Sequence, residues 1–278
     1  MVKSLGLNRT MDGRRKVWRG SKADELIPEC NHTAITFDID WAPDWCIEKC
    51  ISLCRKHDAK ATFFVTHPTC LLNELLSDPL FEVGIHPNFL SGSSQGSDPL
   101  SVLEFCMNLV PDAASMRTHS LHQSTEIFRL IAETFPSIST DVSLLLPLHA
   151  HLMPTDLYFA GGHNRITRLP YFWEDDVFAE WPGWEWDQPP PECPGLKIFD
   201  FHPVYVALNI KDMDGYRTIK ERLYPRKLHE ADYEDFFPFL NGSEGACTFL
   251  ERVLGKYGRG CSSTVSEMTQ CYRGAINA

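Results

Sequence analysis

The chain has 278 residues, which is enough for one large α/β domain. Hydrophobic residues make up 43% of it and charged residues 23%, as in a globular protein with a sizeable core. The formal net charge of −11 argues against binding to nucleic acid, whose phosphates demand basic patches, and no apolar run approaches the ~20 residues of a membrane span.

Residues 1–30 form a polar and basic N-terminal segment. They lack the apolar stretch that a secretory signal requires after its basic start. We therefore predict a cytoplasmic protein, with a single domain over residues 31–278.

Short apolar, β-branched runs then alternate with helical patterns along the chain. We expect helices at residues 43–57, 99–109, 124–133, 216–223 and 245–256. We expect strands at residues 33–37, 61–65, 81–85, 115–117, 142–146, 166–169 and 197–201. This alternation predicts a mostly parallel sheet.

Three cysteines share one face of the first predicted helix. Cys46, Cys50 and Cys54 are spaced at i, i+4 and i+8. A metal or cluster site is one interpretation. Thiols on a buried helix face, in a reducing compartment, are the other. The C-x3-C-x3-C spacing differs from the C-x3-C-x2-C of radical-enzyme clusters and favours the buried face.

Residues 172–194 are expected to form a long irregular loop rich in tryptophan and acidic residues. Loops of this length are often lids or binding loops, and indole rings suit the apolar faces of sugars. The tryptophans could equally pin the loop onto the body of the protein, so both interpretations remain open. The acidic triplet at 174–176 is expected at the solvated rim of a pocket.

Ionisable residues stand where four of the predicted strands end. They are Asp38, His86, Arg117 and His202. In barrel-like α/β folds the carboxyl ends of the strands carry the active site, so these side chains are expected in one pocket. Asp38 and Asp40 form a D-x-D pair, in which one carboxylate can bind a metal while the other acts as a base. A lone D-x-D is also typical of a solvated turn. Oxygen together with imidazole ligands suits zinc or another first-row divalent metal.

Four short segments carry a family resemblance. Residues 36–40 are T-F-D-I-D, residues 82–86 are E-V-G-I-H, residues 117–120 are R-T-H-S and residues 200–202 are D-F-H. In this order they resemble the T-F-D-D-G, E-[IV]-G-x-H, R-x-P-x-G and L-x-H motifs of the polysaccharide deacetylases with the NodB homology domain, carbohydrate esterase family four. The sequence looks most like the divergent members associated with O-antigen and other surface-polysaccharide gene clusters. The resemblance covers roughly residues 33–209.

This resemblance implies a fold and a reaction. The fold would be an α/β, distorted (β/α) barrel of about seven parallel strands. The reaction would be hydrolysis of an N-acetyl group on a carbohydrate substrate by a water that a divalent metal, expected to be zinc, activates. Asp38 matches the general base, Arg117 the arginine that fixes the base, and His202 the general acid.

The family's metal ligands match less directly. His86 matches the first histidine. The second acid falls on Ile39 without a gap and on Asp40 after a shift of one residue. We favour Asp40, because isoleucine cannot bind metal. The family's second histidine falls on Leu90, which cannot serve either.

Other polar residues could complete that site. Asn88, His119 or His122 are the candidates, and our assignment takes His119 as the third ligand. We place Asn88, together with Trp173 and Asp175, in contact with the substrate.

Several alternatives stay open at this point. His119 and His122 could cap the helix that begins near Ser124. His149 and His151 form an H-x-H pair at the end of a predicted strand, which would place both on one face as a pair of metal ligands. The whole protein could also be a catalytically inactive, deacetylase-like binding or scaffold protein. A third possibility is another metal-assisted hydrolysis on the same fold, such as removal of a different acyl group or C–N cleavage in a small amide.

Overall fold

The computed structural model describes residues 33–159 and 164–277. The predicted polar segment at residues 1–30 lies outside this range. A nine-stranded sheet runs through the centre, in the order β6-β7-β5-β4-β3-β2-β1-β9-β8. All neighbouring strands pair in parallel except β6 and β7. The strands are β1 (Thr33–Asp38), β2 (Ala61–Val65), β3 (Phe81–Ile85), β4 (Ser115–Met116), β5 (Thr140–Asp141), β6 (Thr155–Tyr158), β7 (Arg165–Arg168), β8 (Trp173–Glu174) and β9 (Lys197–Phe201).

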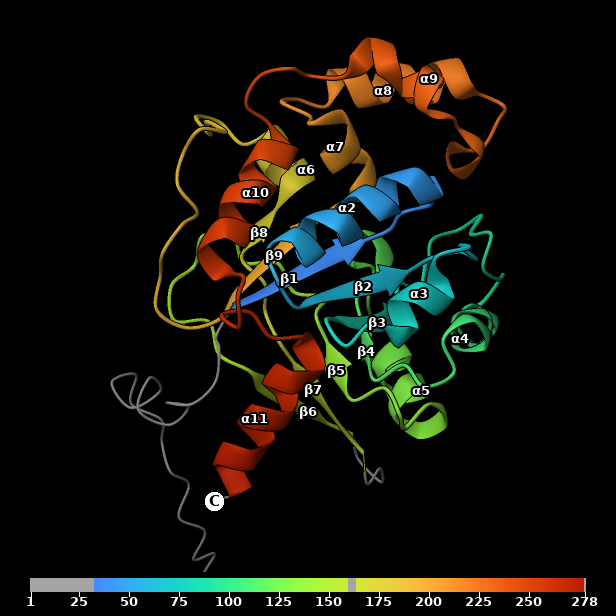
Figure 1. Cartoon of the computed structure of the whole chain (residues 1–278). Helices are drawn as coiled ribbons and strands as arrows, with labels where there is room; N and C mark the ends of the chain where they lie inside the picture. Colours follow the sequence, from blue (N-terminus) through green and yellow to red (C-terminus); the bar gives the residue numbers. More distant parts are fainter. Residues whose placement is uncertain (1–32, 160–163, 278) are drawn as a thin grey trace, which may run out of the picture.

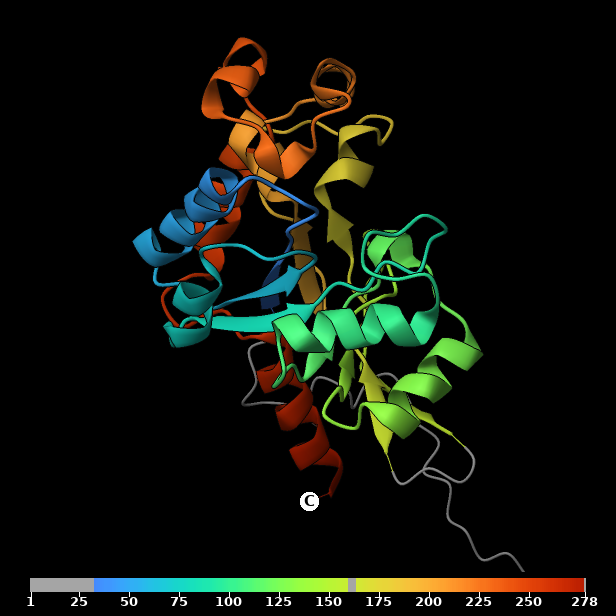
Figure 2. The same cartoon turned by 90° about the vertical axis from the view of Figure 1, so that its right-hand side faces the viewer.

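The sheet curls into a half-barrel with helices along its outside (Figure 1). Figure 2, the view turned by 90°, shows α8 and α9 at the end of the molecule opposite α11. The α/β, mostly parallel barrel-like fold expected from the sequence is confirmed. The helices are α2 (Asp44–Lys56), α3 (Leu72–Ser77), α4 (Pro99–Leu109), α5 (Thr125–Thr134), α6 (Asp175–Ala179), α7 (Pro203–Leu208), α8 (Asp214–Leu223), α9 (Tyr233–Phe236), α10 (Ala246–Tyr257) and α11 (Val265–Asn277), with the 3-10 turns η1 (His119–Leu121), η2 (Leu228–Glu230) and η3 (Phe237–Phe239).

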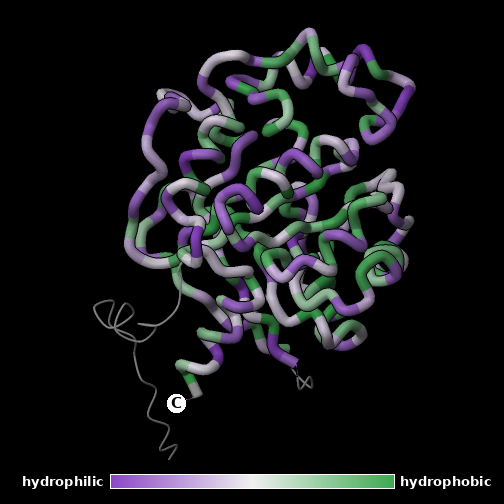
Figure 3. Tube along the Cα trace, viewed as in Figure 1, coloured by the Kyte–Doolittle hydropathy of each residue, from purple (hydrophilic) through white to green (hydrophobic). Residues whose placement is uncertain are grey.

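Local sequence explains why the main elements form. Every residue of β1 and β2 is buried, as in parallel strands covered on both faces. Helix α4 begins at Pro99 behind the capping side chain of Asp98. Helix α5 begins behind Ser124, whose hydroxyl accepts a hydrogen bond from the Ile127 N–H. Hydrophobic and hydrophilic stretches alternate along the flanking helices in Figure 3.

The three cysteines of α2 lie in the core. Cys46, Cys50 and Cys54 are fully buried and carry free thiols. Burial raises the pKa of each of these thiols, which keeps it protonated. None of the three belongs to a group of converging metal-ligating atoms in the part of the chain that the structure describes. The geometry therefore supports the buried-face interpretation.

The bounds of the strand predicted at residues 142–146 are wrong, because within this range only Leu145 pairs with another strand segment, in an isolated bridge to Tyr171. The ladder runs over Thr140–Asp141 and ends there, because the Asp141 carboxylate accepts a hydrogen bond from the Ser143 N–H two residues on. Such a side-chain turn competes with continued strand pairing. The expected irregular loop at 172–194 also needs correction, because it begins with β8 and α6.

A methyl group at Gly84 is predicted to destabilise the sheet. A Cβ there would lie 2.6 Å from the Ser115 Oγ and 2.7 Å from the Phe64 ring. Overpacking of this kind costs ~1–3 kcal/mol, so Gly84→Ala is expected to lower the urea midpoint of unfolding. The control is Gly255→Ala in α10, where a Cβ would have open space around it. This substitution is expected to raise the midpoint, because alanine favours the helix more than glycine does. Equal midpoints for Gly84→Ala and the unaltered protein would contradict this packing.

Candidate active site

The carboxyl ends of the central strands meet around a small pocket of about 60 Å³. The fold therefore brings together the four strand-end side chains expected from the sequence. Asp38, His86 and His202 line the pocket, and Arg117 is buried directly behind Asp38. The pocket is lined by Asp38, Asp40, His86, Thr118, His119, Ser120, Leu121, Glu174, Asp176 and His202.

A tight turn after β1 brings both acids of the D-x-D pair to this pocket. Ile39 is fully buried in the core, and its N–H donates to the Phe64 carbonyl. Asp40 and Trp41 then adopt left-handed backbone, with φ of 37° and 54°. Residues other than glycine rarely adopt such angles. Those that do are often found at functional sites. The turn therefore explains why Asp40, rather than position 39, faces the pocket.

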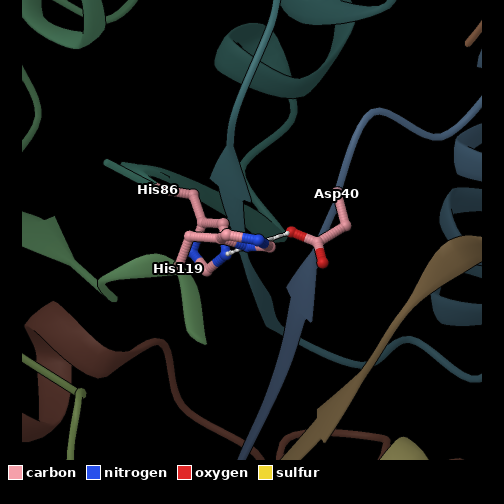
Figure 4. A group of neighbouring side chains, drawn as sticks. All are labelled: Asp40, His86 and His119. Carbon is pink, nitrogen blue, oxygen red and sulfur yellow. Dashed lines mark hydrogen bonds and ion pairs between the residues drawn. The ribbon is translucent and has the colours of Figure 1, made fainter. Parts of the chain in front are cut away.

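Asp40, His86 and His119 form a triangle of potential metal ligands (Figure 4). The Asp40 Oδ1 lies 3.1 Å from the His86 Nε2 and 3.1 Å from the His119 Nδ1. The two ring nitrogens are 3.3 Å apart. These residues come from the ends of β1 and β3 and from η1. Two imidazole nitrogens that converge on one carboxylate oxygen are an arrangement that a divalent cation would fit.

Electrostatics inside the triangle favour an ionised carboxylate. Burial alone would raise the pKa of Asp40, but hydrogen bonds with His119 and His86 hold the pKa well below its usual value. Burial would likewise lower the pKa of His119, and the hydrogen bond with Asp40 raises it instead. The Nδ1 of His86 has no hydrogen-bond partner among the described residues.

Arg117 fixes the position of Asp38. Its Nη1 donates to the Asp38 Oδ1 at 2.9 Å, and its Nε donates to the Val142 carbonyl at 3.2 Å. The guanidinium is fully buried and lies over the rings of Phe64 and Tyr171, 4.9 and 4.4 Å from their centroids. The other oxygen of Asp38 points towards His86, 3.5 Å from its Nε2.

Asp200 is a site residue that the sequence prediction missed. Its Oδ1 accepts hydrogen bonds from Arg117 and, at 2.7 Å, from the Thr36 hydroxyl. Asp200 lies on β9, and His202 follows directly after the end of this strand, so strand alternation places both on one face. That alternation was the signal that could have found it.

Asp175 orients His202. The His202 Nδ1 lies 2.7 Å from the Asp175 Oδ1, and the His202 N–H donates to the Asp175 Oδ2 at 2.8 Å. Burial disfavours the charged imidazole, yet the charge of Asp175 and this hydrogen bond raise the pKa of His202 well above its usual value. Asp175 is itself fully buried, and burial raises its pKa to about 6. Its predicted contact with substrate is therefore wrong, because its carboxylate is occupied by His202.

Glu174 and Asp176 line the pocket instead of lying at a solvated rim. Burial, together with the charge of Asp176, raises the pKa of Glu174 to about 8. The Tyr171 hydroxyl donates to the Glu174 Oε2 at 2.8 Å. Burial also raises the pKa of Asp176. The acidic triplet at 174–176 thus belongs to the pocket and its support.

Trp173 lies in the core rather than in the site. It is fully buried and stacks on Phe178 and Phe249, with centroids 5.3 and 4.6 Å apart. The predicted stacking of Trp173 on a sugar is therefore wrong, because neither face is accessible. Trp173 and Trp186 are buried and pin the loop onto the body of the protein, whereas Trp181 is 41% exposed.

Asn88 lies outside the pocket that Asp40, His86 and His119 line. Its Oδ1 accepts a hydrogen bond from the Leu90 N–H, and both residues line a separate cavity formed by residues 88–102. The structure thus does not place Asn88 beside His86 and Asp40, and its predicted substrate contact gains no support. His122, His149 and His151 are exposed and lie outside the pocket lining.

The fold and site define a class, the deacetylase-type half-barrel with polar residues gathered at the strand ends. A model of the WbmS-like polysaccharide deacetylase family matches residues 35–220, which is more than half of the chain. The chain therefore belongs to the WbmS-like polysaccharide deacetylase family.

A solved structure supports the same conclusion. It is the crystal structure of WbmS from Bordetella bronchiseptica, a protein assigned as a polysaccharide deacetylase involved in O-antigen biosynthesis. The two chains are 32% identical with a TM-score of 0.70, over 81% of this chain and 90% of WbmS. A comparison with curated proteins finds no match. Over residues 33–159 and 164–277, no helix is long and apolar enough to cross a membrane.

The triangle predicts metal binding that depends on all three side chains. We expect Asp40→Asn, His86→Ala and His119→Ala each to weaken zinc binding by at least about tenfold, because each removes one of three converging ligands. Calorimetric titration of metal-free protein measures this. The matched control is His151→Ala, an exposed histidine outside the pocket. Unchanged affinity in the three variants would rule out this triangle as the metal centre.

Proposed function

We propose that this protein is a metal-dependent hydrolase that removes an N-acetyl group, or another acyl group, from a sugar used in surface-polysaccharide biosynthesis. The observation that carries the proposal is the Asp40–His86–His119 triangle, with Asp38 on one side and His202 on the other. Family membership and the O-antigen assignment of WbmS support the choice of substrate class.

Zinc is the metal that these ligands favour. Ligand atoms in a tetrahedral zinc site with bonds of ~2.0–2.1 Å lie ~3.3 Å from one another. The three separations in the triangle are 3.1, 3.1 and 3.3 Å. One carboxylate oxygen with two imidazole nitrogens also leaves a coordination position for water or substrate, as in catalytic zinc sites. When bound, the cation would supply Lewis acidity that activates water and polarises the acyl carbonyl.

The protein's own groups would carry the proton transfers. Asp38 offers one oxygen to the pocket while Arg117 holds the other, which suits a general base. The raised pKa of His202 keeps the imidazole protonated at neutral pH, so that it can donate a proton to the departing amine. An amine is a poor leaving group until it is protonated. The pocket of about 60 Å³ suits an acyl group better than a whole sugar ring.

The second candidate function is an inactive, deacetylase-like binding or scaffold protein. The feature that favours it is Leu90, which stands where the family has its second histidine ligand. Leu90 is 39% exposed and lies in a different loop, whereas His119 stands beside His86 and Asp40. This position of His119 supports the hydrolase over the scaffold.

Acetate release tests the proposed function. We expect the zinc-loaded protein to release acetate from N-acetylated amino sugars, offered free and nucleotide-linked, and to lose this activity after chelation. Asp38→Asn is expected to lower kcat by about a hundredfold or more while zinc binding persists, because it removes the base and not a ligand. Full activity in Asp38→Asn would refute the assigned base. Stoichiometric zinc without release of acetate, or of another acyl group from correspondingly acylated sugars, would favour the scaffold.

The pH dependence tests the Asp175–His202 pair. Because His202 must be protonated to act as an acid, activity is expected to fall as pH rises through its raised pKa. Asp175→Asn removes the charge that raises this pKa, so the alkaline limb of kcat/KM should move to lower pH by about one unit or more. The control is Asp156→Asn, which alters a carboxylate paired with Arg165 outside the pocket. An unmoved alkaline limb in Asp175→Asn would contradict this role of the pair.

A further inference from the structure

Asp200 is a fully buried acid that the reaction proposed above does not use. Its Oδ1 takes both of its described hydrogen bonds, from the Arg117 Nη1 and from the Thr36 hydroxyl. Its Oδ2 is buried and has no partner among the described residues. Burial raises the pKa of Asp200 well above its usual value, although the charge of Arg117 opposes this. Such a carboxyl group disfavours folding unless another requirement retains it.

The hydrogen bonds of Arg117 show what Asp200 does. The Nη1 is shared between Asp38 and Asp200, and the Nη2 donates to the Thr36 hydroxyl at 2.9 Å. The single hydrogen of the Thr36 hydroxyl is shared between the Asp200 Oδ1, at 2.7 Å, and the Phe199 carbonyl, at 2.9 Å. The guanidinium, the hydroxyl and the carboxyl group thus form a closed ring of hydrogen bonds. Asp38 consequently receives a single bond from Arg117, on Oδ1.

Without this ring, a guanidinium and a carboxylate prefer a different geometry. Arginine commonly binds a carboxylate with two parallel N–H bonds, one to each oxygen. On Asp38 that fork would cover Oδ2, the oxygen that faces His86 and the pocket. Asp200 and Thr36 draw the second edge of the guanidinium towards β9 and β1 instead.

We propose that Asp200 is a positioning residue that holds Arg117 away from the Asp38 Oδ2, so that this oxygen stays open towards the reacting group. The inference rests on the proposed function, in which Asp38 is the base. It extends the role of Arg117, which fixes one oxygen of the base and is itself prevented from covering the other.

A second buried pair offers a matched control. Asp141 is fully buried on β5, and its Oδ2 accepts from the Arg168 Nε at 2.7 Å. Its Oδ1 accepts from the Ser143 N–H, so both oxygens are used. Asp141→Asn therefore disturbs a buried ion pair of the same kind without touching Asp38 or Arg117.

The kinetic test compares Asp200→Ala, Asp200→Asn and Asp141→Asn in the zinc-loaded protein, with acetate release as the assay. Asp200→Ala is expected to lower kcat by about tenfold to a hundredfold and to leave KM within about twofold, since only the base is misplaced. Asp200→Asn keeps an oxygen for Arg117 and Thr36 and should recover most of the loss. Asp141→Asn should keep the kcat of the unaltered protein. Zinc stoichiometry should stay the same in all three.

A crystal structure of Asp200→Ala gives a readout that does not depend on activity. We expect both Nη groups of Arg117 on the two oxygens of Asp38. An Arg117 that keeps its single bond to Oδ1 overturns the inference, as does an unchanged kcat in Asp200→Ala or an equal loss in Asp141→Asn. If the unaltered protein releases neither acetate nor another acyl group from acylated sugars, the proposed function fails, and the crystal structure still decides the position of Arg117.

Discussion

The buried guanidinium of Arg117 is the constraint on which the site depends. A fully buried cation is unfavourable unless charges and hydrogen bonds compensate it. Burial alone would lower the pKa of Arg117, and the charges of Asp200 and Asp38 raise it instead. These acids stand on β9 and β1, while Arg117 follows β4. One interaction therefore ties three strand ends together, and the polar pocket opens directly in front of them.

Around this interaction the protein places ionisable groups in contrasting environments. Asp40 accepts hydrogen bonds from two imidazoles, which hold its pKa low, whereas burial beside another acid raises the pKa of Glu174 to about 8. Although burial opposes this, the charge of Asp175 and its hydrogen bond raise the pKa of His202 well above its usual value. Environments that separate pKa values in this way allow one pocket to contain both a group that accepts protons and a group that donates them.

The backbone supplies the remaining geometry. Asp40 lies in left-handed backbone, and so do Ser120 and Leu121 directly after His119. Such turns redirect a side chain within one or two residues, and they are retained when the surrounding structure demands them. They explain why the triangle of Asp40, His86 and His119 departs from the ligand spacing of the NodB motifs. Ile39 is buried in the core, and the third member of the triangle, His119, comes from the segment after β4 instead of from the loop after β3.

The sequence by itself determined the parallel α/β fold, the strands β1, β2, β3 and β9, and the gathering of Asp38, His86 and His202 at strand ends. These features depend on local patterns, such as apolar runs and helix caps, which act over a few residues. Only the tertiary structure decided that His119 stands beside Asp40, that Asp175 supports His202, and that Trp173 is buried. Asp40 and His119 are 79 positions apart, and Arg117 and Asp200 are 83 apart. Such contacts depend on how the strands are ordered and how the turns redirect the chain, and no local pattern contains that information.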